Sequence, residues 1–289
     1  MNVTSVKKRS QVRLVWMRYR KSATALIGMA LLLILVLISG TADLWLDYEQ
    51  QAIYQDVEQR LRPPDAEYPF GTDHYGRDVF ARVVFGTRIS LLVGILTIGL
   101  SLTAGAIIGS LAGFFGGRLD NVLMRLMDVL LAIPAILLAI SIVAALGGGL
   151  VNLIIALTVS AVPRFAYIVR STILTIKGQE FIEAARCYAS SNARIIVRHI
   201  LPNVIGPIIV QATTNMASTI LLISSLSFVG LGLPSSTPEW GSMLADAKQY
   251  MRHNPYLIIF PGVAIILAVM ALNLIGDGLR DALDPKLKN

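Results

Sequence analysis

Asp73, His74 and Asp78 stand out first for their chemistry, because two carboxylates and an imidazole lie within one short polar run. Such groups bind metal ions in many proteins, so a metal site is one interpretation of the run. Their spacing matches no established pattern of metal ligands. A Gly-rich turn that leads into an amphipathic interfacial helix explains the run better. We therefore predict that the chain has no metal site.

Signatures of common hydrolases and nucleotide-binding proteins are absent from the sequence. No Gly-x-x-x-x-Gly-Lys stretch is present, so the chain has no P-loop of its own to hold a nucleotide. His-Glu-x-x-His and Gly-x-Ser-x-Gly are also absent. The single Cys187 excludes an internal disulfide bond. These absences predict a protein that is not an enzyme and that binds no cofactor itself.

A polar segment, Gln179–Asn203, lies between long apolar stretches and favours helix formation. Its first part predicts a short helix with four apolar side chains on one face, Phe181, Ile182, Ala185 and Ala189. The run Ser190-Ser191-Asn192 supplies a break and an N-cap for a second helix, and Pro202 marks the boundary with the next apolar run. At a membrane surface, two such helices would present a contact to a protein outside the membrane.

The composition is that of an all-α polytopic membrane protein. The 289 residues are 55% hydrophobic and only 15% charged, whereas roughly 25% is typical of soluble domains. The net charge of +7 reflects membrane topology rather than nucleic-acid binding, because no tract interleaves basic and aromatic residues.

Six transmembrane helices are predicted from the apolar stretches. Gly147-Gly148-Gly149 divides the third helix from the fourth, while Pro134 and Pro163 are tolerated inside helices, where they can introduce kinks. Small residues four apart, as at Gly105 and Gly109, predict close packing of the second helix against a partner helix. The six spans are expected at about residues 22–42, 89–117, 121–146, 150–169, 200–228 and 257–275.

The distribution of charge predicts that both termini are cytoplasmic, because Lys and Arg are then concentrated inside. The first span is too long for a signal-peptide core of about 7–15 residues, so we expect it to be retained. Residues 1–21 are then a basic cytoplasmic segment and residues 22–289 a transmembrane domain. Within that domain we expect external loops at 43–88 and 231–256, a cytoplasmic segment at 179–203 and a cytoplasmic tail at 276–289.

The predicted spans carry no ionisable residues in their interiors, which argues against a transporter coupled to protons or sodium. If the chain moves a solute uphill, the energy must therefore come from another protein through residues 179–203.

Residues Glu183-Ala184-Ala185, the Ala189 position and Leu201-Pro202 resemble the cytoplasmic signature of the permease subunits of bacterial ABC importers. Ala189 stands where that family normally has Gly, and His199 where it often has Ile. Gly at such a turn permits positive φ, which Ala adopts at a cost of roughly 1 kcal/mol. The turn therefore either moves toward Asn192 or leaves Ala189 helical.

Further motifs in order along the chain resemble the dipeptide, oligopeptide and nickel permease family, and within it the second or "C" permease subunit. Each motif alone is weak, but the ordered series is specific. They are Gly71-Thr72-Asp73 with Gly76-Arg77-Asp78, Arg88-Ile89-Ser90-Leu91, Gly116-Gly117 with Asp120 and Met124-Arg125, Arg198–Asn203, Leu226–Gly232, Pro238–Gly241 and Asn273–Pro285.

This resemblance implies a type I importer-like fold in the bacterial inner membrane. It also implies four kinds of partner: a second permease subunit, two ATP-binding subunits that carry ATP and Mg, an external solute-binding protein and the lipid bilayer. The cargo implied is di- or oligopeptide, with nickel, a metal chelate, glutathione or another small solute as alternatives. A stand-alone channel or a membrane receptor is the alternative from a different class.

The resemblance also implies where the ATPase binds, although it identifies no substrate-binding residue. Glu183 is the expected polar contact, with solvation of its helix as the alternative role, and Ala184 and Ala185 would allow close approach. Arg186, Arg194 and Arg198 are either contacts or topological anchors. The coupling residues predicted are Glu183, Ala184, Ala185, Arg186, Ala189, Ser190 and Arg194.

Overall fold

The computed structural model describes residues 11–187 and 191–283, and nearly all of the regular structure in them is helical. One isolated bridge pairs Thr72 with Asp78. The α-helices are α1 (Gln11–Tyr19), α2 (Ala23–Gly40), α3 (Val79–Phe115), α4 (Gly117–Ala132), α5 (Ala135–Leu146), α6 (Leu150–Ile176), α7 (Glu180–Cys187), α8 (Asn192–Arg194), α9 (Leu201–Phe228), α10 (Trp240–Ala247) and α11 (Tyr256–Leu283). The 3₁₀- and π-helices are η1 (Ala42–Leu44), η2 (Tyr48–Ile53), η3 (Val57–Gln59) and η4 (Ile195–Ile200).

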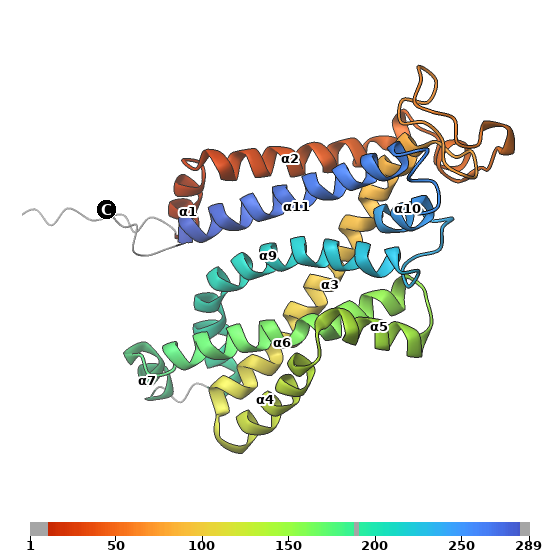
Figure 1. Ribbon diagram of the computed structural model, residues 1–289. Coiled ribbons are helices and arrows are strands. Elements are labelled where there is room, and N and C mark those ends of the chain that lie inside the picture. The colour runs from red at the N-terminus through yellow and green to blue at the C-terminus, as the bar shows by residue number, and fades with distance from the viewer. Residues whose placement is uncertain (1–10, 188–190, 284–289) are drawn as a thin grey trace, which may run out of the picture.

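The long helices form a bundle with different short helices and loops at its two ends. Helix α2 lies beside α11, and α9 lies between α11 and α6 (Figure 1). Helices α1 and α7 and the last turns of α11 lie at one end, whereas α10 and the loop between α2 and α3 lie at the other. The C-terminal end of α11 and the predicted cytoplasmic segment are thus at the same end of the bundle, as the sequence analysis expects.

Five helices in the described part of the chain are long and apolar enough to cross a membrane, namely α2, α3, α6, α9 and α11. Helices α4 and α5 together make a sixth span if the pair is counted as one, although they meet at an angle of 91°. The structure therefore agrees with six apolar segments and with the divide at Gly147–Gly149, where positive φ values at Gly147 and Gly149 separate α5 from α6.

The prediction of one continuous third helix is wrong. Helix α4 ends at Ala132, and Ile133 is extended, with φ −95° and ψ 127°. The cause is Pro134, which has no N–H to donate and disfavours helical geometry in the residue before it. Pro163 has no such effect, because α6 runs through it as one helix from Leu150 to Ile176.

Two further boundaries differ from the sequence prediction. Helix α3 begins at Val79 rather than Ile89, because Asp78 caps it by accepting a hydrogen bond from the Phe80 N–H at 2.8 Å. The expected interfacial helix is therefore the first part of α3. Helix α6 extends to Ile176 and not only to about residue 169, so Arg164 lies in the interior of a span and not near its end, contrary to the prediction that span interiors carry no ionisable residue.

Close packing of α3 against α6 confirms the role predicted for its small residues. A Cβ atom at Gly105 would lie 2.5 Å from the Phe165 Cβ, and one at Gly109 would lie 2.9 Å from the Val169 Cβ. Only glycine therefore allows the two helices to approach this closely at these positions.

Candidate functional site

Helix α7 follows the C-terminal end of α6 after a short turn and buries one side of its surface. Ile182 is fully buried, and Ala185 is 7% exposed. Both belong to an apolar cluster that joins the ends of α3 and α6 to the start of α9; its buried members are Phe114, Val169, Ile173, Ile176, Ile182, Ala185, Ile195, Ile200, Val204 and Ile208. We call this set the coupling cluster. A rigid displacement of α7 would therefore be transmitted to three long helices through direct contacts.

The other side of α7 is exposed. Glu183 and Ala184 are exposed, so the predicted polar contact and one of the two small residues face away from the bundle. Phe181 is 40% exposed, although the helical pattern placed it on the apolar face with Ile182 and Ala185. That placement is wrong, and Phe181 instead adds an exposed aromatic ring to α7 that the sequence analysis did not include in the site. Its type was a usable signal, because aromatic residues are enriched at protein interfaces.

The second half of the segment is continuous with α9. Ser191 caps α8 through its side chain, which accepts from the Arg194 N–H at 3.4 Å, as predicted. A turn of π-helix, η4, then leads directly into α9, where Pro202 occupies the first turn. Pro202 therefore starts α9 instead of ending the segment, because its missing N–H is not needed in the first turn of a helix.

The remaining predicted coupling residues divide into three groups. Arg194 is exposed on α8, while Ala185 packs inward in the coupling cluster. Arg186 lies in α7, and its side chain is outside the described structure. Ala189 and Ser190 lie outside the described residues altogether.

An ion pair fastens α4 to α6 near this end of the bundle. The Asp120 carboxylate accepts from the Arg170 guanidinium in a two-point contact, with both N–O distances 2.6 Å. The Tyr167 hydroxyl donates to the Asp128 carboxylate, about one turn from Arg170 on α6 and about two turns from Asp120 on α4. The two contacts bring α4 into the same mechanical unit as α6 and α7.

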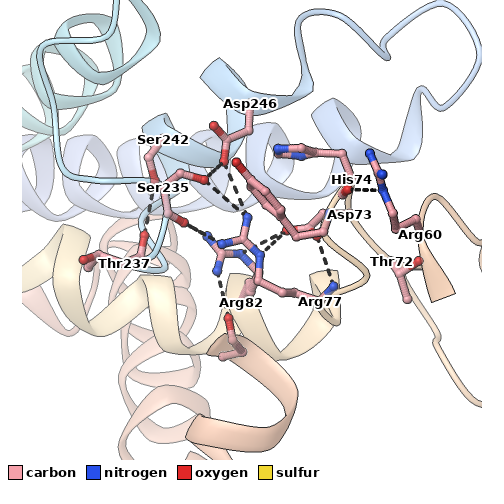
Figure 2. Close-up of polar contacts among 12 residues, drawn as sticks. Arg60, Thr72, Asp73, His74, Arg77, Arg82, Ser235, Thr237, Ser242 and Asp246 are labelled. Carbon is pink, nitrogen blue, oxygen red and sulfur yellow. Dashed lines mark hydrogen bonds and ion pairs between the residues drawn. The ribbon is translucent and has the colours of Figure 1, made fainter. Parts of the chain in front are cut away.

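The opposite end of the molecule holds a buried charge network around Arg77 and Arg82, each of which is 1% exposed (Figure 2). Arg77 Nε lies 2.7 Å from Asp73 Oδ2. Both guanidinium groups also donate to the Ser235 carbonyl at 2.8 Å, and the Ser235 hydroxyl bonds to Asp246. The network thus joins the start of α3 to the connection between α9 and α10.

The groups considered as metal ligands have other roles in this network and beside it. Asp73 accepts from Arg77, and Asp78 caps α3. Burial raises the pKa of Asp78 to about 6, and burial lowers the pKa of His74. The described residues contain no cluster of three or more His, Cys, Asp or Glu side chains suited to a metal ion.

A cavity of about 170 Å³ lies between α5, α6 and α9. The sequence analysis did not predict it, although Arg164 next to Pro163 in an otherwise apolar stretch was a usable signal. Polar side chains on facing helices form much of its lining; they are Ser160 and Arg164 on α6 and Asn215, Ser218 and Thr219 on α9.

Comparison with known proteins places the chain in a family. The family described as "Binding-protein-dependent transport system inner membrane component" matches residues 105–289, and "N-terminal TM domain of oligopeptide transport permease C" matches residues 10–64.

Individual relatives match over almost the whole chain. A dipeptide transport system permease protein of Alkalihalophilus pseudofirmus is 43% identical and covers 93% of this chain and 88% of its own length. A di/tripeptide transport system permease protein of Pseudomonas aeruginosa is 39% identical and covers 97% and 94%. A glutathione transport system permease protein of Escherichia coli is 41% identical and covers 100% and 96%.

The fold is also similar to that of a solved ABC transporter. A chain of the MetNI methionine transporter, in a structure titled as inward facing, aligns with a TM-score of 0.58 at 21% identity and covers 70% of this chain and 97% of its own. Together these matches confirm the resemblance drawn from the sequence motifs. The chain belongs to the family of inner membrane components of binding-protein-dependent transport systems, as a multi-pass permease subunit of the ABC dipeptide and oligopeptide type.

Proposed function

We propose that this chain forms, with a second and different permease subunit, the pathway of an importer for short peptides, and that ATPase subunits drive it through α7. The relatives named for dipeptide and di/tripeptide transport support peptides as the cargo. This chain has no P-loop, so we assign the binding of ATP and Mg to the partner ATPases.

The geometry of α7 carries the mechanical part of the proposal. One side of the helix is built into the coupling cluster through Ile182 and Ala185, while Phe181 and Glu183 face outward. A short helix with this division can seat in a groove of an ATPase and convert closure of that groove into rotation of α3, α6 and α9. Ala184 leaves room for close approach beside Glu183.

The arrangement of the bundle supports the proposed topology and partners. Helices α1 and α7 and the end of α11 lie at the same end of the bundle, which is consistent with two cytoplasmic termini on the side of the ATPases (Figure 1). The loop of residues 43–78 and α10 then form the external face, on which a solute-binding protein would deliver its cargo.

Reversing the charge at Glu183 tests the contact with the ATPase. Glu183→Arg should reduce co-purification of the ATPase subunits about tenfold or more, because it places a like charge where the groove accepts an anion. Asp281→Arg is the matched control, since Asp281 is an exposed acid at the same end of the bundle and should leave co-purification unchanged. Membrane insertion of both variants should be normal. Equal co-purification of Glu183→Arg and wild type would contradict the contact.

Glutathione is the second candidate cargo, because the glutathione permease relative matches the full length of this chain. ATP-dependent uptake of a labelled dipeptide into proteoliposomes, with unlabelled tripeptide or glutathione as competitor, separates the two. Competition by tripeptide and not by glutathione supports peptide import. The reverse pattern would assign glutathione instead. Uptake that persisted without ATPase subunits would contradict the importer itself.

A further inference from the structure

The cavity between α5, α6 and α9 lies deep in the membrane-spanning part of the bundle. Arg164 is fourteen residues from Leu150 at the start of α6, which places it about 21 Å along the helix. Asn215 occupies the middle of α9, which runs from Leu201 to Phe228. The two polar side chains therefore meet the same cavity from facing helices, far from either helix end.

Arg164 is a charge without a partner inside this chain. Across residues 11–187 and 191–283, no ion pair or hydrogen bond engages its side chain, which is exposed at the cavity. By contrast, Arg170 on the same helix is held by Asp120. A cation in a membrane span is costly and is retained where it faces a binding site or a pathway.

The side-chain amide of Asn215 adds a second hydrogen-bond donor without a partner to the same cavity. Its side chain is 5% exposed, and its Nδ2 group has no hydrogen-bond partner, while its Oδ1 accepts from Gln211 Nε2 at 3.0 Å. A buried amide N–H without an acceptor costs free energy until an acceptor arrives. The hydroxyls of Ser160 and Ser218 already donate to carbonyls of their own helices.

The chemistry of these groups specifies the ligand. The guanidinium of Arg164 offers only donors, and so does the free N–H of Asn215, so the complementary group is an oxygen acceptor that carries negative charge. A carboxylate meets this need, because it accepts from both groups and pairs with a guanidinium in a two-point contact. A cavity of about 170 Å³ has the volume of roughly five or six waters, so it accommodates one end of a peptide.

We propose that Arg164 and Asn215 form a binding site for the carboxylate of a solute in transit, namely the C-terminus of a peptide. This inference rests on the proposed import of peptides and names the end of the peptide that the pathway recognises.

The test is protection of a cysteine in the cavity from a water-soluble thiol reagent. Cys187 is the only native cysteine and is first replaced by Ser. Ser218→Cys then places a thiol at the cavity lining, and Ser225→Cys is the control, because Ser225 is exposed on the same helix and does not line the cavity. Labelling is measured on the complete transporter in detergent without its solute-binding protein, in the presence of alanyl-phenylalanine or its C-terminal amide.

The free-acid dipeptide should slow labelling of Ser218→Cys about tenfold, while the amide should leave it within about twofold, because a hydrogen-bonded charge pair is lost with the carboxylate. Adding Arg164→Gln should abolish the protection, and Arg164→Lys should restore part of it. Labelling of Ser225→Cys should not respond to either peptide.

Equal protection by the acid and the amide, or protection that survives Arg164→Gln, would overturn the inference. So would loss of the second permease subunit from Arg164→Gln but not from Arg164→Lys, since Arg164 would then pair with an acid of that subunit. Wild-type proteoliposomes that took up no peptide would instead overturn the proposed function, while the labelling assay would still report whether a carboxylate binds.

Discussion

Helix α7 and the segments at the opposite end of the bundle are held in place by different forces. At the end that carries α10, which is external in the proposed topology, two buried arginines bond to Asp73 and to the Ser235 carbonyl, which is more than 150 residues away in sequence. At the other end, α7 is held by the coupling cluster, and no ion pair engages any of its described side chains.

The difference fits the roles proposed for the two ends. Buried charged hydrogen bonds are directional and fix one geometry, because each group must keep its partner. Apolar contacts are not directional, so packed helices can slide or rotate by small amounts without leaving a polar group unpaired. The external network therefore suits a fixed frame, and the coupling cluster suits a part that transmits motion.

Removing an arginine from the external network should have the largest effect. Arg77→Ala removes the nearer of the two guanidinium groups that pair with buried Asp73 and leaves only Arg82, so we expect a loss of about 3–5 kcal/mol in the free energy of unfolding. The measurement is thermal unfolding of the purified chain in detergent. Arg62→Ala is the control, because its ion pairs with Asp65 and Glu67 are solvent-accessible and worth about 0–1 kcal/mol. Equal losses in the two variants would remove the distinction between the two ends.

Adjacent residues on α7 test the division between its buried and exposed sides. Ile182→Ala removes a fully buried side chain from the coupling cluster and should cost about 2–5 kcal/mol of stability. Phe181→Ala, at an exposed position, should change stability by about 0.5 kcal/mol or less and weaken ATPase binding instead. Unfolding and co-purification are measured on both. A stability loss with Phe181→Ala as large as that with Ile182→Ala would mean that both side chains are buried.

The bundle was predictable from sequence wherever the signal is local. Long apolar stretches, the Gly147–Gly149 divide and the spacing of Gly105 and Gly109 depend on neighbouring residues, and the structure confirms each. The break at Pro134 was not predictable in the same way, because Pro163 leaves α6 intact and only the local backbone decides between the two outcomes.

The sites were less predictable because they depend on contacts between distant segments. The pattern of α7 indicated an apolar face, but only the packing of α3, α6 and α9 showed that Phe181 lies outside it. Arg77 and Ser235 are joined only after the chain folds, and only then do Arg164 and Asn215 line the same cavity. A single sequence carries no direct record of those pairs.

The α3–α6 contact connects the two ends, and its glycines should be sensitive to one added methyl group. Gly109→Ala places a Cβ against the backbone of Ala166 and the side chain of Val169, so we expect a loss of about 1–3 kcal/mol. Gly99→Ala is the matched control on the same helix, because no atom lies within 4 Å of its added Cβ. Thermal unfolding compares the two. A tolerated Gly109→Ala would show that α3 and α6 can separate slightly, which would make this contact part of the moving end.

Asp78 provides the smallest and most specific test of the external network, because ionisation of its buried carboxyl group lowers the stability of the folded protein. Burial raises its pKa from 3.8 to about 6, so the folded protein holds the proton more tightly than the unfolded chain. Stability from this group is therefore greatest below about pH 4 and falls as the pH rises to about 6, above which it is constant. The shift is equivalent to a penalty of about 1–3 kcal/mol at neutral pH.

Asp78→Asn keeps an oxygen for the Phe80 N–H and removes the charge, so the variant should lose the penalty while α3 stays capped. We expect it to be more stable than wild type at pH 7.5 and equal to it near pH 4, as measured by thermal unfolding at both values. Other groups titrate in this range, but they are common to both proteins and cancel in the difference. A variant less stable at both pH values would mean that the Asp78 carboxylate itself stabilises this end of the molecule. The charge of Asp78 would then contribute to stability together with those of Asp73, Arg77 and Arg82.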